Sequence, residues 1–170
     1  MSLPSRETEM RASSDAASNF ADAYYDALNR RKPKGTMSQF YTTACSKYPT
    51  PPDISVNGAV LANGPDEYTT LLDTQGPDVR YEIESLDAHV VNPDFSLGCP
   101  EHLQGGDKNG AKCSVMAQVT GRVYYGKGRD AAAKTFNEVF VLVPNWDTFG
   151  KNPPRGVRRW LIMSQNFRAL

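Results

Sequence analysis

The candidates for acid–base catalysis in this 170-residue sequence are Tyr24, Asp87, His89 and Glu138. An aspartate or a histidine can act as a general base, and a tyrosine or a carboxylic acid can donate a hydrogen bond beside it. His89 falls at the end of an expected strand, however, and belongs to no recognisable catalytic dyad. We interpret Tyr24 and Glu138 as a hydrogen-bonded structural pair in the core, which makes catalysis the weaker hypothesis.

The cysteines, the charges and the hydropathy each argue against a class of function. Cys45, Cys99 and Cys113 are an odd number and lack the spacing of a metal site, which predicts free thiols in a reducing compartment and no bound metal. Nineteen basic residues balance nineteen acidic ones, so the chain lacks the positive excess of proteins that bind nucleic-acid phosphates. No apolar run approaches the ~20 residues of a membrane-spanning helix. No motif predicts a cofactor.

The elements that must position these side chains change type along the sequence. Residues 1–14 are polar and aperiodic, and we interpret them as a flexible leader. Apolar residues at helical spacing then predict three helices, which begin near Asp15, Met37 and Pro65. The Asn-Gly sequence at 57–58 predicts a tight hairpin between the second and the third of these helices.

From Val79 onward the apolar residues alternate, which is typical of strands. Four long strands are expected over residues 79–90, 113–125, 134–143 and 157–168. A slip of parity near Ser85 predicts a bulge that bends the first strand, and a long loop over 92–112 follows it. Residues 15–170 are therefore expected to form a single α+β domain, with three N-terminal helices packed on a strongly curved, mainly antiparallel sheet.

Two of these strands lack the alternation expected of a sheet with one face in water. Residues 139–143 are apolar at five consecutive positions and residues 160–163 at four. Because side chains of a strand point alternately to opposite faces, both faces carry apolar surface, and the helices cover only one of them. The long loops, or the tail before Asp15, can cover the second face, but so much apolar surface favours a partner protein. We expect an interface of about 800 Å² per side.

Strand parity divides the side chains of the last three strands into two sets. The partner-facing set is Gln118, Thr120, Arg122, Asn137, Val139, Val141, Ser164, Asn166 and Arg168. The helix-facing core set is Val115, Ala117, Val119, Phe140, Leu142, Leu161, Met163 and Phe167. A bulge in any strand would exchange the two sets beyond it.

Several segments resemble the nuclear transport factor 2-like family. Residues 20–31, with paired tyrosines, are similar to its first helix, and residues 136–142 to a strand usually written F-x-Q-x-F-x-L. Residues 160–168 are similar to its closing strand, which typically ends in Phe-Arg. Each motif alone is weak, but their order and spacing over residues 15–170 are specific. Within the family, the chain most resembles the small, non-catalytic partner subunit of the mRNA-export receptor, of fungal type.

This resemblance implies a partner, a function and a location. The sheet is expected to pair face to face with the related domain of the large mRNA-export receptor subunit, with Arg168 in a salt bridge to an acidic residue of that partner. The heterodimer would carry mRNA, and as a further hypothesis ribosomal particles, through nuclear pores. The expected partners are thus the large subunit, nuclear pore proteins through the complex, and RNA weakly or indirectly, with no membrane. The protein would shuttle between nucleus, nuclear pore and cytoplasm.

Two alternatives come with the same family. The fold also hosts small-molecule isomerases and dehydratases, so fold alone does not exclude catalysis. A homodimeric transport carrier of the family uses acidic residues after the second strand, where this chain has Gly-Lys-Gly-Arg at 126–129. Gln118 and Asn166 also stand where self-pairing relatives tend to have apolar residues, which favours pairing with a different chain. The loop over 92–112 is longer than in animal subunits and is interpreted as an extra contact surface.

Overall fold

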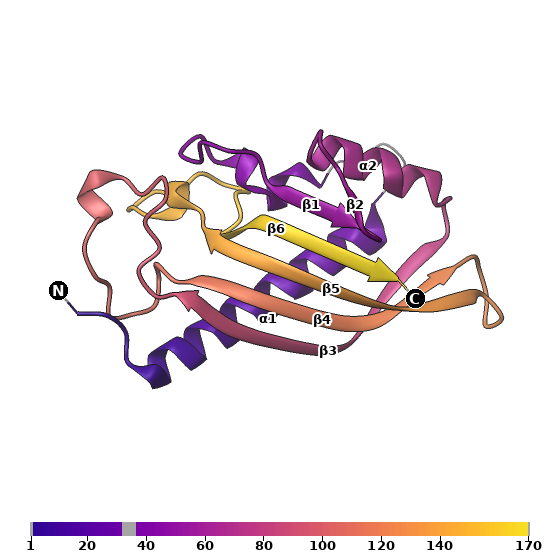
Figure 1. Ribbon diagram of the computed structural model, residues 1–170, viewed down its shortest axis with the longest axis horizontal. Helices are drawn as coiled ribbons and strands as arrows, with labels where there is room; N and C mark the ends of the chain where they lie inside the picture. Colours follow the sequence, from indigo (N-terminus) through magenta and orange to yellow (C-terminus); the bar gives the residue numbers. More distant parts are fainter. Residues whose placement is uncertain (1, 32–36, 170) are drawn as a thin grey trace.

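A curved six-stranded sheet lies against one long helix in the computed structural model, which describes residues 2–31 and 37–169. The strands lie in the order β2-β1-β6-β5-β4-β3, and all neighbours are antiparallel except β1 and β6. The elements are α1 (Arg6–Arg30), η1 (Ser38–Phe40), η2 (Thr42–Ala44), β1 (Asp53–Val56), β2 (Ala59–Val60), α2 (Pro65–Thr74), β3 (Val79–Asn92), η3 (Glu101–Leu103), β4 (Ser114–Tyr125), β5 (Ala132–Pro144), η4 (Trp146–Thr148) and β6 (Trp160–Ala169). In Figure 1, α1 passes behind the strands, so the opposite face of the sheet is turned toward the reader.

The described residues contain two α-helices rather than the three expected. The expected second helix is instead a pair of 3-10 turns, η1 and η2, separated by Tyr41. Tyr41 has an extended backbone and forms a bridge with Ile162 of β6. Its buried hydroxyl donates to Gln165 Oε1 at 2.5 Å. Pairing with the sheet therefore interrupts the helical segment, although its apolar spacing is helical.

The interpretation of residues 1–14 as a flexible leader is wrong for residues 6–14, which form the first turns of α1. Ser5 caps this helix, because its Oγ accepts a hydrogen bond from the Thr8 backbone N–H at 3.2 Å. Glu7 and Glu9 stand in the first turn, where carboxylates stabilise the positive end of the helix dipole. These residues lack an apolar stripe, but the cap and the charges favour a helix without one.

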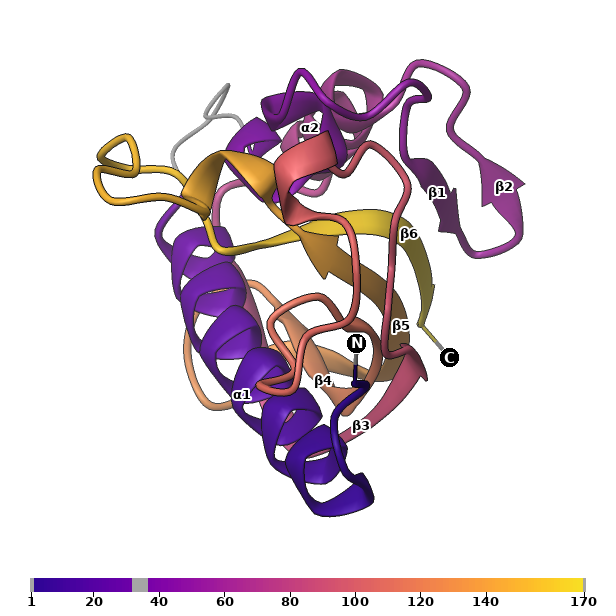
Figure 2. The ribbon, with the colours of Figure 1, turned by 90° about the vertical axis from the view of Figure 1, so that its left-hand side faces the viewer.

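Two local predictions about the strands are confirmed. Asn57 and Gly58 both have positive φ, 50° and 86°, as the tight hairpin between β1 and β2 requires. The register of β3 shifts between Ile83 and Ser85, where the bulge was expected. Beside it, Gly121 of β4 passes so close to β3 that a Cβ there would lie 2.0 Å from the Glu82 carbonyl oxygen. The bend of the sheet seen in Figure 2 is thus accommodated by a bulge and a glycine on adjacent strands.

A bulge in β6 overturns part of the predicted core. Val141 pairs with Ser164 but Leu142 pairs with Ile162, so Met163 is an extra residue in β6. Ile162 therefore faces α1, whereas Leu161 and Met163 pack in a separate cluster on the other face. The other six members of the predicted core set lie in the main core, namely Val115, Ala117, Val119, Phe140, Leu142 and Phe167.

Candidate partner-binding face of the sheet

The nine residues of the predicted interface share the sheet face opposite α1, in aligned rows across β4, β5 and β6. One row joins Gln118, Val139 and Asn166, and the next joins Thr120, Asn137 and Arg168. Val141 lies beside Ser164 in a third row, and Arg122 lies at the end of β4 toward its turn with β5. We call this set of nine residues the open face. Its role in binding stays a prediction.

The centre of the open face is apolar and its surroundings are polar. Val139 and Val141 are half-buried, while Gln118, Asn166 and Arg168 are exposed around them. Asn137 Nδ2 donates to Thr120 Oγ1 at 3.3 Å, which ties two strands together at the surface. Arg122 Nε lies 3.0 Å from Glu84 Oε1 of β3, so this guanidinium already has an intramolecular partner. An apolar strip ringed by hydrogen-bonding groups is the usual anatomy of a protein interface.

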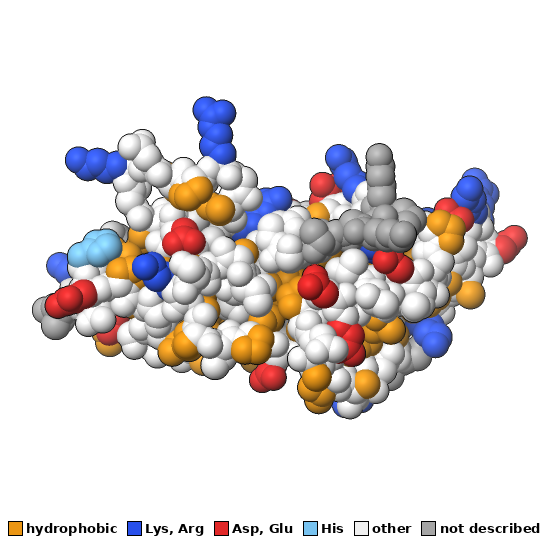
Figure 3. Space-filling model, turned by 90° about the horizontal axis from the view of Figure 1, so that it is seen from above, with side chains coloured by type: hydrophobic (Ala, Val, Ile, Leu, Met, Phe, Trp, Pro, Cys, Tyr) orange, Lys and Arg blue, Asp and Glu red, His pale blue; other side chains and the backbone are white. Residues whose placement is uncertain are grey.

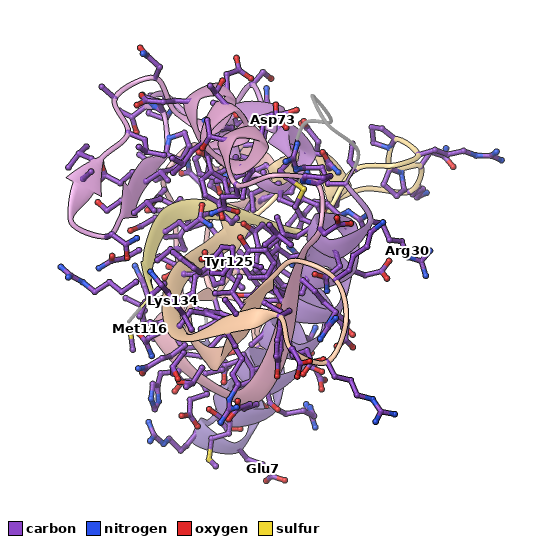
Figure 4. The ribbon with its side chains drawn as sticks, turned by 90° about the vertical axis from the view of Figure 1, so that its right-hand side faces the viewer. Glu7, Arg30, Asp73, Met116, Tyr125 and Lys134 are labelled. Carbon is purple, nitrogen blue, oxygen red and sulfur yellow. The ribbon has the colours of Figure 1, made fainter. Side chains whose placement is uncertain are left out.

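The same face of the sheet carries further residues, on β4 and on β1, that the sequence did not assign to the interface. Met116 lies beside Val141, on the opposite side of the sheet from Arg30 of α1 in Figure 4. Ser55 of β1 pairs with Asn166, and Asp53 pairs with Ser164. The parity of β4 could have identified Met116, because it lies two residues before Gln118. The contribution of β1 depends on its parallel pairing with β6, for which no local signal exists.

At one end of the sheet this same surface is covered by the chain itself. Val143 and Leu161, both fully buried, pack with Cys45, Cys99 and Trp146. Trp146 Nε1 donates to the Leu97 carbonyl at 2.9 Å, so a segment of the long loop 93–112 is held over the strands. The apolar run at 139–143 thus divides into a covered end and an open centre. Coverage by a loop, the alternative to a partner, accounts for the covered end only.

The long loop is fixed by buried polar contacts as well as by apolar packing. Lys112 is 3% exposed, and its Nζ donates to Asp94 Oδ1 at 2.9 Å and to the Gly105 carbonyl at 2.7 Å. Arg159 Nη2 donates to the Ala111 carbonyl, and the guanidinium lies against the rings of two aromatic side chains. Burial lowers the pKa of Arg159 to about 10. The loop is therefore part of the folded body, and its role as an extra contact surface stays a prediction.

The side chains proposed for acid–base chemistry lie on opposite sides of the sheet. Glu138 is fully buried among the helix-facing residues of β5, whereas Asp87 and His89 are exposed on β3, beside Gln118 and Met116 of the outer face. These candidates therefore do not converge on one site. Within the described residues, no cluster of three or more His, Cys, Asp or Glu side chains is placed to hold a metal ion.

Glu138 belongs to a closed hydrogen-bond network, and the predicted pairing with Tyr24 is indirect. Tyr25, not Tyr24, donates to Glu138 Oε1, at 2.5 Å. Gln165 Nε2 bridges the two groups, 2.6 Å from Glu138 Oε2 and 2.9 Å from Tyr24 Oη. Burial raises the pKa of Glu138 to about 7, although the hydrogen bonds from Tyr25 and Gln165 favour its ionised form. The polar side chains of this part of the interior are therefore bonded to one another.

No protein-family model and no curated protein matches this sequence. Among solved structures, Mtr2 is 30% identical with a TM-score of 0.79, and the match covers 94% of this chain and 99% of that chain. This chain belongs to the Mtr2 family. The structure of the Chaetomium thermophilum Mex67 NTF2-like domain complexed with Mtr2 matches at 34% identity and a TM-score of 0.82, with 94% of this chain and 99% of that chain covered.

Mtr2-family membership is supported by a further complex, a Sac3N peptide bound to Mex67:Mtr2. It matches at 32% identity and a TM-score of 0.83, again over 94% of this chain and 99% of that chain. Nuclear transport factor 2 from Cryptosporidium parvum is only 16% identical, with a TM-score of 0.55 over 100% of this chain and 99% of that chain, which shows a shared fold alone. The fold is therefore NTF2-like, and the more specific relationship is to Mtr2.

Proposed function

We propose that this chain is the small subunit of an mRNA-export heterodimer and that its open face binds the NTF2-like domain of a Mex67-type large subunit. Two of the similar structures contain Mtr2 together with Mex67. The observation that carries the proposal is the half-buried strip of Val139 and Val141, which the chain leaves uncovered although it covers Val143 on the same face. Monomeric proteins rarely leave such an apolar strip in contact with water, whereas the centre of a protein interface is typically apolar.

The polar residues around the strip favour a different chain over a second copy as the partner. Gln118 and Asn166 flank Val139 in one row across the sheet. A buried amide needs a matched donor or acceptor opposite it, and a different sequence can supply that match directly. Arg168 is exposed at the end of β6. Its guanidinium can form two hydrogen bonds with a carboxylate of a different chain.

A non-catalytic role is consistent with the interior of the domain. In this fold an enzyme would place its acid and base in a cavity between the helices and the sheet. Here Tyr24, Tyr25 and Glu138 are each at most 3% exposed, and their polar atoms bond to one another or to Gln165. This enclosure supports a small subunit that contributes binding surface rather than chemistry.

Contact with RNA, with pore proteins and shuttling between compartments would then come through the heterodimer. The chain has no net charge, and Figure 3 shows basic and acidic side chains interspersed over the face seen from above. A surface of mixed sign does not provide the positive stripe that phosphate binding requires. The long loop is also mixed in sign, since Asp94, Glu101 and Asp107 accompany Lys108 and Lys112. Direct RNA binding by this chain is therefore expected to be weak.

Co-expression with a Mex67-type NTF2-like domain tests the proposal. The expected product is a one-to-one complex, measured by size-exclusion chromatography with light scattering, and the chain alone should remain soluble but self-associate weakly. A stable homodimer that excludes the large domain would favour the carrier alternative. A monomer indifferent to the large domain would contradict both.

A further inference from the structure

A groove of about 720 Å³ runs between the first half of α1 and the second half of β3. It lies at the margin of the sheet, where β3 has no strand beyond it (Figure 2). Residues 86–90 form one side, and α1 forms the other, largely with the small side chains of Ser14, Ala17 and Ser18. The groove is not part of the open face and has no role in the function proposed above.

The edge of β3 offers unpaired backbone groups to this groove. Between the register shifts at Ile83/Ser85 and Val90/Asn92, residues 85–90 pair regularly with β4. In an antiparallel ladder, alternate residues direct their N–H and C=O groups to the neighbouring strand and the others direct them away. Every second residue of 85–90 therefore directs outward an N–H and a C=O that no other described residue binds, which is the template for adding another strand.

The side chains of the groove are suited to an extended peptide. Leu86, Ala88 and Val90 are half-buried and pack against the main core, so they form an apolar floor with the two-residue period of a strand. Met10, 63% exposed, adds apolar surface at the helix side. Neighbouring strands of a sheet lie about 4.8 Å apart. The small residues on α1 leave room for a further strand at that distance from β3. A helix, about 10 Å across, would not pair with the edge.

The charges beside the groove indicate the sign of the peptide. Glu9 lines the helix side and is half-buried, and Asp87 is exposed on the strand side. In the part of the chain that the structure describes, neither carboxylate has a cation within salt-bridge distance. Arg6 is the one guanidinium among the groove's described lining residues. Asp87 shares the outer face with Gln118, so a basic side chain between the inward-facing apolar ones of the incoming strand would meet this unpaired carboxylate.

We propose that this groove binds an extended segment of a partner protein, which adds to β3 as a further strand, with apolar side chains at alternate positions and a basic residue between them. A second copy of the chain fits less well, because edge-to-edge pairing of two β3 strands would bring two α1 helices toward the same space. Asp87 and His89 also lie beside Gln118 and Met116, so the edge adjoins the open face while the groove opens on the helix side. Both surfaces can be occupied together.

A synthetic peptide that alternates valine with threonine and lysine provides the probe. It is titrated into the isotope-labelled full chain, free and in complex with the large-subunit domain, while amide resonances are followed by NMR. We expect saturable shifts confined to residues 85–90 and the first turns of α1. N-methylation of one alternate set of peptide amides should weaken binding by about tenfold per lost hydrogen bond, and methylation of the other set should leave it intact.

Two variants of α1 separate groove binding from non-specific binding. Ser18→Phe fills the groove from an exposed position on α1 and should abolish the shifts. Asp26→Phe places the same ring on the same helix outside the groove and should leave them unchanged. Absence of shifts at millimolar peptide, or equal loss with both methylation sets, would overturn the proposal. Self-association of the chain without peptide, seen as concentration-dependent shifts of the same amide resonances, would also overturn the proposal, because a second copy would then occupy the groove.

Discussion

Gln165 and Glu138 face each other on adjacent strands beneath α1, with Gln165 Nε2 2.6 Å from Glu138 Oε2. Gln165 also donates to Tyr24 and accepts from Tyr41, so one amide connects α1, the segment after η1, β5 and β6. A fully buried carboxyl group with no cation beside it is costly when ionised. Its protonation should therefore control the stability of the domain.

Replacement of Glu138 by glutamine should flatten the pH dependence of stability. The pKa of Glu138 is about 7 in the folded chain and 4.5 ordinarily, so the folded state retains a proton that the unfolded state has released between these values. The free energy of unfolding of the wild type should thus fall by about 3 kcal/mol as pH rises through this window, and then level off. Urea unfolding of wild type and Glu138→Gln from acid to neutral pH measures the difference. Parallel curves would show that Glu138 is not the titrating group.

Val139→Glu should prevent assembly with the large subunit. The substitution places a charge at the centre of the open face, where burial against a partner would strand it without a counter-ion. Because Val139 is only half-buried in the free chain, the fold should tolerate the change. Thr70→Glu, exposed on α2, adds the same charge to the helix layer and serves as the control. If both variants copurify equally well with the large domain, the interface lies elsewhere.

Arg168→Ala should weaken the heterodimer. If Arg168 pairs with a carboxylate buried at the interface, loss of the guanidinium strands that charge and costs about 3–5 kcal/mol of binding free energy. Arg168→Lys keeps the charge without the planar fork and should give an intermediate dissociation constant. Calorimetry compares both with Arg30→Ala, which removes an exposed guanidinium from α1. If Arg168→Ala has the dissociation constant of the wild type, Arg168 is exposed to solvent in the heterodimer and does not pair with a carboxylate of the partner.

Trp146→Ala should release the long loop from the sheet. Trp146 is 3% exposed, stacks on Phe95 and donates to the Leu97 carbonyl, so its loss should cost about 3–5 kcal/mol of stability. Hydrogen exchange should accelerate in residues 93–112 while the β4 and β5 amides stay protected. Leu97→Ala, with a side chain 43% exposed, should change neither. Uniform acceleration would mean that the loop and the sheet unfold as one unit.

The sequence predicted well where a local pattern determines the structure. The hairpin at Asn57-Gly58 follows from backbone conformations that few other residues adopt, and the bulge near Ser85 follows from a visible slip of parity. The face shared by Gln118, Val139 and Asn166 follows from the two-residue period of strands.

Prediction failed where neighbouring residues have the same chemical character. The bulge at Met163 lies in a run of apolar residues, so no change of polarity marks the exchange of faces. Tyr24 and Tyr25 are adjacent and both buried, and spacing alone does not tell which one reaches Glu138. The helix before Asp15 was missed because its signal is a cap at Ser5 rather than an apolar stripe.

The coverage of Val143 and Leu161 by the long loop has an evolutionary consequence. A longer loop can cover more of the sheet surface that a second protein would otherwise contact, and a shorter loop leaves more of that surface exposed. Loop length in this subunit and footprint size in its large counterpart should therefore change together among species, with insertions on one side matched by trimming on the other.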